Sequence, residues 1–356
     1  MNTSFISLKD IAAICGVSLS TVSKALHDYP DISRETAERI QKTASELGYI
    51  KLPPVPRPPA DSSRRIGVLL LKNDLTPFEE YYFHKIIYSF SQMVSARGYD
   101  PLLFLDKRNP GSASVISRVL LQHPDGLCIV GLEKTDAAIR ELLDNTPHII
   151  SIDRLLDRHQ SVLSSQDEGI RILMAYCRMK GHTRIAYFNT VDSFYNRRAR
   201  DTYIRYAHEM SLPSSYLTNI TISRAEDSSI LPKYRSNLRS ELSRLLSLPE
   251  RPSCILCSDD LFAYACIREL ESMDIRVPDM ISVAGFGAFS IHMGIRPYLT
   301  TVQPFPEVIG SRAAHDLIDS IEDPASVRYK PVYIEPVLVE GCSVKDLSLD
   351  KTALLN

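Results

Sequence analysis

Three short amphipathic helices joined by tight turns are predicted within residues 7–49. Each has a start signal, because Ser7, Ser18 and Ser33 stand where an N-cap side chain would accept a hydrogen bond from the first helical turn. Helices this short must pack on one another, which leaves the outer face of the second helix free. The expected buried positions are Leu8, Ile11, Ala12, Val22, Ala25, Leu26, Ala37, Ile40, Ala44 and Leu47.

The free face of the second helix suits a DNA major groove, which admits an α-helix. Short hydroxyl side chains and helix N-termini hold phosphates, while a few longer side chains reach base edges. An ordinary helical bundle is the alternative, but the agreement of caps, turn and apolar spacing favours a helix-turn-helix. The residues on this face are Leu19, Ser20, Thr21, Ser23, Lys24 and His27.

From residue 65 onward, apolar strand-like runs alternate with amphipathic helical stretches. This alternation predicts parallel sheets covered by helices on both faces. About a dozen such elements exceed what one core holds, so two doubly wound subdomains are expected, with ligands at the carboxyl ends of the strands. The strand-like runs are 66–71, 101–105, 126–130, 148–152, 184–188, 253–257 and 281–285. Examples of the helical stretches are 79–97, 167–180, 198–210 and 260–273.

Charge and cysteine usage narrow the class of protein only a little. The formal net charge of the 356 residues is −2, and six lysines and arginines balance six carboxylates within residues 1–51. DNA affinity must therefore depend on where the charges point and on the pairing of two headpieces. Cys254 and Cys257 have CxxC spacing, but residues three apart on a strand face opposite sides, so buried small hydrophobes are expected rather than a redox or zinc pair. With no signal-peptide pattern and no membrane-spanning run, a cytoplasmic protein that does not contact membranes is expected.

The run GVSLSTVSKAL (16–26), followed by residues 32–49, resembles the DNA-binding headpiece of the LacI/GalR family of bacterial transcriptional regulators. The family pattern is a Gly-Val-Ser turn, two variable base-reading residues, Thr-Val-Ser-Arg/Lys, and Ser-x-x-Thr on the third helix. The resemblance implies that Leu19 and Ser20 read base edges, with Lys24 close to them. Lysine replaces the commoner arginine here and cannot make its two-pronged contact with guanine. The resemblance implies phosphate contacts at Thr21, Ser23, Ser33, Thr36 and Tyr49.

The resemblance covers roughly residues 7–343 and implies a periplasmic-binding-protein-like α/β sensor body behind the headpiece. The matching pieces are RGY (97–99), PDG (124–126), IDR (152–154), KGHTRIA (180–186), VPD (277–279), ISVAGF (281–286) and PYLTTV (297–302). The expected parts are a helix-turn-helix headpiece at 1–50, a linker at 51–64, an effector-binding and dimerisation body at 65–343, and a tail at 344–356. In the body, the N-subdomain is expected at about 65–160 and 290–322, and the C-subdomain at about 161–289 and 323–343.

The linker departs from the family pattern, in which a hinge helix forms on DNA and a leucine wedges into the minor groove. Pro54, Pro56, Pro58 and Pro59 stand in the corresponding stretch. Each removes an amide donor, clashes with a preceding carbonyl, and costs about 3 kcal/mol in a helix interior. The stretch therefore predicts a stiff polyproline II strut of about 3.1 Å per residue instead of a hinge helix.

The expected effector cleft also departs from the family, whose sugar- and purine-binding members use an arginine, an Asn-Asp pair and a later aspartate. Asp259 and Asp260 stand for the Asn-Asp pair, Gly287 replaces the last aspartate, and Ser165 replaces an earlier one. Strict alignment places Ala199 at the usual arginine position.

Three neighbouring arginines nevertheless indicate an anionic effector. Arginine side chains bind carboxylates and phosphates through paired hydrogen bonds, so a sugar phosphate or organic acid fits this cluster. A solvated helix start, paired with Asp192 and Asp201, is an equally weighted alternative. The cluster is Arg197, Arg198 and Arg200. The candidate effector residues are Asn73, Phe78, Asp153, Arg198, Asp259 and Asp260, with ordinary loop packing as the alternative for the first three.

Three functions are open at this point. The first is a dimeric regulator of repressor type, which binds a palindromic operator and changes its affinity when a sugar, sugar phosphate or organic acid binds the cleft. The second is the same DNA-binding protein with a degenerate cleft, either controlled by a protein partner or constitutive. The third is an enzyme, which is disfavoured because the sequence has no nucleophile elbow, P-loop, metal-ligand cluster or dinucleotide fingerprint. No cofactor is expected.

Overall fold

Contacts divide the chain of the computed structural model into two compact units, Met1–Arg57 and Pro58–Asn356. Residues 51–61 are not among those that the structure describes, so the polyproline strut stays a prediction. Within the described ranges, no helix combines the length and the apolar character needed to cross a membrane. The described residues are 8–26, 32–46, 62–72, 75, 77–105, 113–132, 137–189, 194–219, 235–289, 298–327 and 329–348.

The first unit contains the three predicted helices: α1 (Leu8–Cys15), α2 (Leu19–Leu26) and α3 (Arg34–Glu46). Gly16 ends α1 with a φ of +64°, and the Val17 amide donates to the Ala12 carbonyl at 3.1 Å, as in a Schellman motif. The side-chain amide of Gln41 donates to the Ala25 carbonyl near the end of α2 at 3.1 Å. The buried core residues all occupy positions that the apolar spacing predicted: Ile11, Ala12, Val22, Ala25, Ile40 and Ala44.

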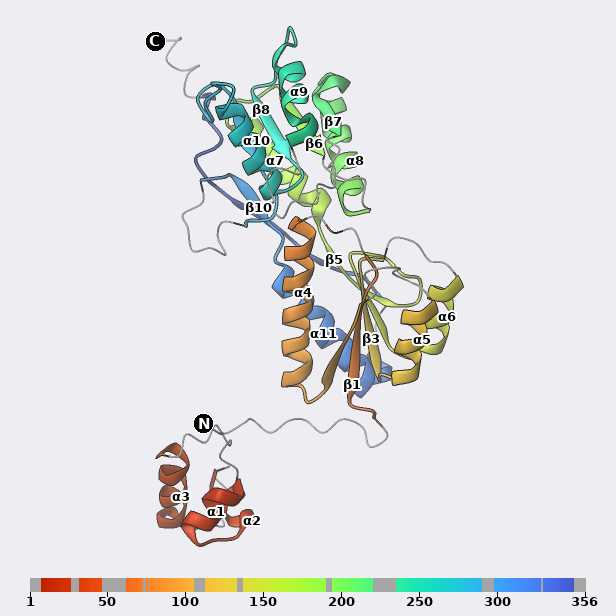
Figure 1. Ribbon diagram of the computed structural model, residues 1–356, viewed down its shortest axis with the longest axis vertical. Helices are drawn as coiled ribbons and strands as arrows, with labels where there is room; N and C mark the ends of the chain where they lie inside the picture. The colour runs from red at the N-terminus through yellow and green to blue at the C-terminus, as the bar shows by residue number, and fades with distance from the viewer. Residues whose placement is uncertain are drawn as a thin grey trace. The chain divides into compact units, whose positions relative to one another are not determined.

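The second unit consists of two subdomains. One of them, here called the N-subdomain, is built on a six-stranded parallel sheet. Its elements are β1 (Arg65–Leu70), α4 (Pro77–Ala96), β2 (Asp100–Leu105), α5 (Ala113–Gln122), β3 (Gly126–Val130), α6 (Ala137–Asn145), β4 (Ile149–Ile152), β5 (Gln160–Ser164), α11 (Pro306–Glu322), η4 (Pro324–Ser326) and β11 (Val332–Ile334). The strand order is β11-β5-β4-β3-β1-β2. Helices α4 and α11 cover one face and α5 and α6 the other (Figure 1). Every residue of β3 and β4 is buried, as expected for strands covered on both faces.

The C-subdomain repeats this architecture with four parallel strands in the order β7-β6-β8-β9. Its elements are α7 (Gln166–Met179), β6 (Ile185–Asn189), α8 (Phe194–Glu209), η1 (Ser214–Tyr216), β7 (Leu217–Asn219), α9 (Arg235–Leu246), β8 (Cys254–Cys257), α10 (Asp260–Glu271) and β9 (Ser282–Ala284). Cys254 packs in the core beneath α7 and α8, whereas Cys257 packs beneath α9 and α10. The two cysteines therefore face opposite sides of β8. The hydrogen bond with Cys177, and then burial, raises the pKa of the Cys254 thiol, whereas burial is the main cause of the raised pKa of Cys257. The predicted fold, a helix-turn-helix headpiece with two doubly wound subdomains, is confirmed.

The chain passes between the subdomains at three places, of which the second and third differ from the expected ones. The passages follow β5, β10 (Thr301–Gln303) and β11, and β10 pairs antiparallel with β12 (Val337–Val339). The sequence assigned 323–343 to the C-subdomain, but β11 pairs with β5 in the six-stranded sheet. The second passage, expected near residue 290, follows Gln303 instead. Strands of three residues with mixed burial carry too little apolar pattern to be recognised from sequence.

Helices α4 and α11 approach so closely that only a glycine fits at their contact. A methyl group on Gly310 would overlap the backbone of Ile86 and the hydroxyl of Ser89. The backbone cannot yield as a flexible side chain would, and both helices bury their facing residues against the sheet.

We expect Gly310→Ala to lower the free energy of unfolding by about 1–3 kcal/mol, because overpacking of a tight helix contact forces the backbone apart. Thermal unfolding followed by circular dichroism measures the loss. Val308→Ala, at a half-exposed position of the same helix, serves as the control and should change stability by less than about 0.5 kcal/mol. Equal stability of Gly310→Ala and the native protein would show that the two helices are less closely packed than described.

Candidate DNA-binding surface and effector site

Two matched serine–threonine pairs stand at the N-termini of α2 and α3. The Ser18 hydroxyl oxygen accepts from the Thr21 amide at 3.1 Å, and the two hydroxyls lie 2.9 Å apart. At α3 the Ser33 oxygen accepts from the Thr36 amide at 3.3 Å, while the Ser33 hydroxyl donates to Thr36 Oγ1 at 2.8 Å. These serines are the caps that the sequence predicted. Each pair places hydroxyl groups beside the positive end of a helix dipole, which is an arrangement suited to phosphate.

The structure describes only some of the other residues that were predicted to contact DNA. Ser20 is exposed and Lys24 half-buried, and both lie on α2 with Thr21. The backbones of Leu19 and Ser23 lie on α2, but their side chains are outside the description, and His27 and Tyr49 are outside the described residues altogether. Base reading by these side chains therefore stays a prediction.

Asp153 is held at the junction of the two subdomains, where the first passage begins. Its Oδ1 accepts from the Ser164 amide at 2.7 Å and from the Ser164 hydroxyl at 2.6 Å, and its Oδ2 accepts from the Tyr82 hydroxyl at 2.9 Å. Burial raises the pKa of Asp153, although these hydrogen bonds and the nearby Arg198 oppose the rise. The carboxylate thus ties the end of β4 to the end of β5 and to α4.

Asp259 and Asp260 are likewise engaged by the protein itself. Asp259 is the N-cap of α10 and accepts from the Phe262 amide at 2.8 Å. Asp260 accepts from the Thr301 hydroxyl at 2.5 Å and from the Phe289 amide at 2.7 Å. Burial raises the pKa of Asp259 to about 7 and that of Asp260 to about 6. These two carboxylates hold the start of α10 against β10, so an effector would have to compete with the fold for their oxygens.

The arginine cluster is largely paired. Arg198 donates to Asp167 at 3.0 Å and lies close enough to Asp153 to influence its pKa. Arg200 pairs with Asp201 at 3.3 Å, as the solvated-helix alternative predicted for that aspartate. Two further predicted effector residues cannot be placed: Asn73 lies outside the described residues, and only the backbone of Phe78 is described.

Sequence reasoning missed the aromatic contact at the subdomain junction. Tyr81 on α4 meets Phe289, after β9, edge to face with ring centroids 5.0 Å apart. Lys85 lies 5.6 Å from the Tyr81 ring centroid and forms an ion pair with Glu307 at 3.2 Å. Helical spacing could have placed Tyr81 one turn from Lys85 on α4, but no pattern in the sequence identifies Phe289 as its partner.

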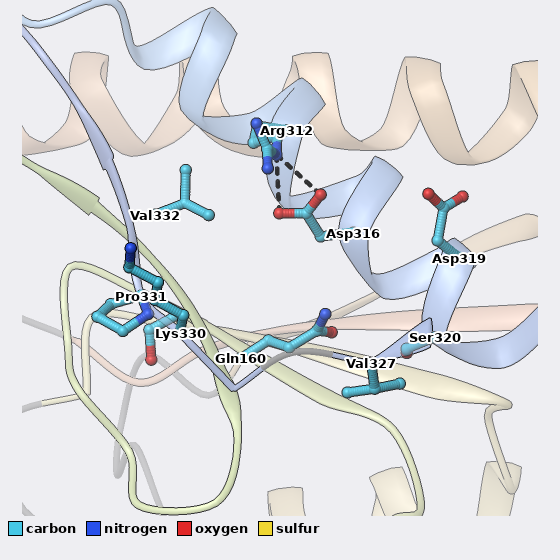
Figure 2. Close-up of a pocket in the computed structure, with 10 residues that line it drawn as sticks. Gln160, Arg312, Asp316, Asp319, Ser320, Val327, Lys330, Pro331 and Val332 are labelled. Atoms are coloured by element: carbon cyan, nitrogen blue, oxygen red, sulfur yellow. Dashed lines mark hydrogen bonds and ion pairs between the residues drawn. The ribbon is translucent and has the colours of Figure 1, made fainter. Parts of the chain in front are cut away.

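A cavity of about 520 Å³ lies on the N-subdomain, between α11, the start of β5 and the chain before β11 (Figure 2). Arg312 donates to both oxygens of Asp316 at 2.8 Å, and Asp319 contacts Arg97 and His315. Three charged side chains of the cavity wall, Arg312, Asp316 and Asp319, are therefore paired within the protein. Among the described residues, no group of three or more histidines, cysteines and carboxylates could hold a metal ion.

Comparison with known proteins agrees with this geometry. Residues 7–51 match the model for bacterial regulatory proteins of the lacI family, and residues 174–344 match a periplasmic binding protein-like domain. The first match contains both serine–threonine pairs. The chain therefore contains a lacI-family DNA-binding domain followed by a periplasmic binding protein-like domain.

The relatives of this chain are named as transcriptional repressors. It is 25% identical to the probable repressor ExuR of Bacillus subtilis, over 90% of this chain and 92% of that protein. It is 26% identical to the repressor PurR of Erwinia tasmaniensis, over 96% and 97% of the two chains. The structure of a lac repressor dimer bound to operator and an anti-inducer has the same fold, with a TM-score of 0.64 and 20% identity over 96% of this chain and all of that one.

Replacing Asp259 by asparagine should change how the stability of the protein depends on pH. The pKa of the folded-state carboxyl lies above its ordinary value of 3.8, so the native protein binds the proton more tightly and loses stability as pH rises from about 4 to 7. Asparagine still caps α10 but cannot ionise. We expect Asp259→Asn to be more stable than the native protein at pH 8, by on the order of 1–3 kcal/mol, and equal to it near pH 4.

Urea unfolding at several pH values measures this difference. Asp279→Asn, at an exposed carboxylate, controls for the change in net charge. The same pH profile for Asp259→Asn and the native protein would show that Asp259 is not held in a desolvated site.

Proposed function

We propose that the chain is a transcriptional repressor that binds a palindromic operator as a homodimer in the cytoplasm. The observation that carries the proposal is the pair of serine–threonine clusters at the starts of α2 and α3, within the segment that matches the lacI-family model. One headpiece covers half of a site, so a dimer is needed to give a two-fold symmetric contact. The lac repressor of similar fold was seen as a dimer on its operator.

In this proposal the two hydroxyl clusters bind phosphates and the free face of α2 specifies sequence. The Ser33 hydroxyl donates its proton to Thr36, which leaves the Thr36 proton available for a phosphate oxygen. Leu19, Ser20 and Lys24 are the proposed base-reading residues, with Thr21, Ser23, His27 and Tyr49 as further contacts. The headpiece is nearly neutral, so these directed contacts take the place of a general basic surface.

We further propose that a small anionic molecule, such as a sugar phosphate or organic acid, modulates DNA binding from the subdomain junction. Arg198 is the side chain best placed to receive it, because its partner Asp167 is partly exposed and can be displaced. Structures of similar fold contain sugars, namely cellobiose and ribose. The engagement of Asp259 and Asp260 in the fold favours a second possibility, that the junction binds no effector and that a partner protein or abundance controls the repressor.

Replacing Thr36 by alanine should weaken binding to every DNA sequence by a similar factor, at least about tenfold, because a phosphate contact carries no sequence information. Selection of DNA from a random pool by the native protein supplies the sites, and fluorescence anisotropy measures affinity for selected and unselected duplexes. Thr43→Ala removes a hydroxyl that bonds the Arg39 carbonyl within α3, and it should leave affinity unchanged. Failure of the native protein to enrich any sequence would refute the proposed function.

Thermal unfolding against sugars, sugar phosphates, organic acids and purines tests for an effector. A ligand at one hundred times its dissociation constant should stabilise the protein by about 2.7 kcal/mol, which shifts the midpoint by a few degrees. We expect Arg198→Ala to abolish the shift and Arg200→Ala, on the same helix, to retain it. No shift across the panel, with DNA binding intact, would favour control by a partner or by abundance.

A further inference from the structure

The linker enters the body through a backbone arrangement that binds one carboxylate. The amides of Ser63 and Arg64 donate to the two oxygens of Asp125, at 2.7 and 2.9 Å, and the Ser62 hydroxyl bonds the same carboxylate. Arg64 has a φ of +59°, the left-handed conformation that turns successive amides toward one anion. A residue other than glycine keeps this conformation only where its surroundings enforce it.

The carbonyl groups of the same segment are also held. The amide of Asp100 donates to the Arg64 carbonyl at 2.7 Å, and the amide of Asp125 donates to the Arg65 carbonyl at 2.7 Å. The Arg65 guanidinium donates to the carbonyl and side chain of Gln122 at 3.2 and 3.1 Å. Residues 62–65 are thus held through both their amide groups and their carbonyl groups at the point where the chain enters β1.

We propose that Asp125 is a positioning residue, which fixes where and in which direction the linker leaves the body and so sets the spacing of the two headpieces on DNA. β1 needs no such anchor for its own pairing, since its ladder with β2 and β3 runs from Arg65 to Leu70. The carboxylate instead orders the three residues before that ladder. A stiff proline-rich linker can set the direction of a headpiece only if the residues that join it to the body are fixed, because otherwise the whole linker rotates about that junction.

The chemistry predicts a selective effect of removing the charge. In Asp125→Asn one side-chain oxygen remains as an acceptor, but the nitrogen that replaces the other cannot accept from an amide. One of the two amide bonds is lost, and the segment loses the charge that orients it. Asp100→Asn is the matched control, since it makes the same change of charge beside Arg64 while leaving the backbone amide of residue 100 in place.

Hydrogen exchange of the full-length protein tests the anchor without DNA. We expect the Ser63 and Arg64 amides to exchange at least tenfold faster in Asp125→Asn than in the native protein, and at the native rate in Asp100→Asn. Thermal unfolding of each variant shows whether the body remains folded. Native protection of both amides in a folded Asp125→Asn would overturn the proposal.

Binding to DNA tests the consequence, and this part rests on the proposed repressor function. Sites selected by the native protein are rebuilt with one, two or three base pairs inserted between the half-sites. The native protein and Asp100→Asn should lose affinity steeply with insertion, whereas Asp125→Asn should lose less. A uniform loss at every spacing would show a merely structural role and overturn the proposal. If the native protein selects no sequence, the repressor function fails, while the exchange experiment still decides whether Asp125 anchors the linker.

Discussion

Carboxylates hold all three passages of the chain between the subdomains. Asp153 binds Ser164 at the first passage, Asp260 binds Thr301 at the second, and Glu335 accepts from the Ser165 hydroxyl at 3.1 Å beside the third. A carboxylate buried with its hydrogen-bond donors fixes geometry strongly, because any displacement leaves charged oxygens without partners. The relation between the two sheets therefore depends on these short contacts together with an apolar core that continues from one subdomain into the other.

The sequence predicted the parts of the fold that have long or periodic patterns. The headpiece core from Ile11 to Ala44 and the buried strand at 126–130 were predicted, because apolar spacing directly encodes which face is buried. It misplaced β11, a three-residue edge strand whose position depends on contacts far away in the chain. That Asp153 and Asp260 contact an effector stays a prediction. The sequence could not show that both also bind hydroxyl groups far away in the chain, since a strand-end carboxylate looks alike whether it faces a ligand or a distant hydroxyl.

The headpiece shows how a domain with no net basic charge can still be shaped for DNA. Its features are local: Ser18 with Thr21, and Ser33 with Thr36, each at a helix start. Such contacts act over hydrogen-bond distances, whereas a basic surface acts over a Debye length of about 8–10 Å. Binding that relies on them is more dependent on exact placement of the headpieces and less on the general attraction of DNA for cations.

The late position of β11 and α11 in the chain affects folding during synthesis. The four strands of the C-subdomain lie between residues 185 and 284, so that sheet can be completed while the sheet begun earlier at β1 still lacks its edge strand. Until α11 is made, the part of the first sheet that it covers, and the side of α4 at Ile86 and Ser89 that it contacts, stay open to solvent. The N-subdomain begins to emerge from the ribosome before the C-subdomain but is completed after it. In that interval it presents apolar surface of the kind that chaperones protect.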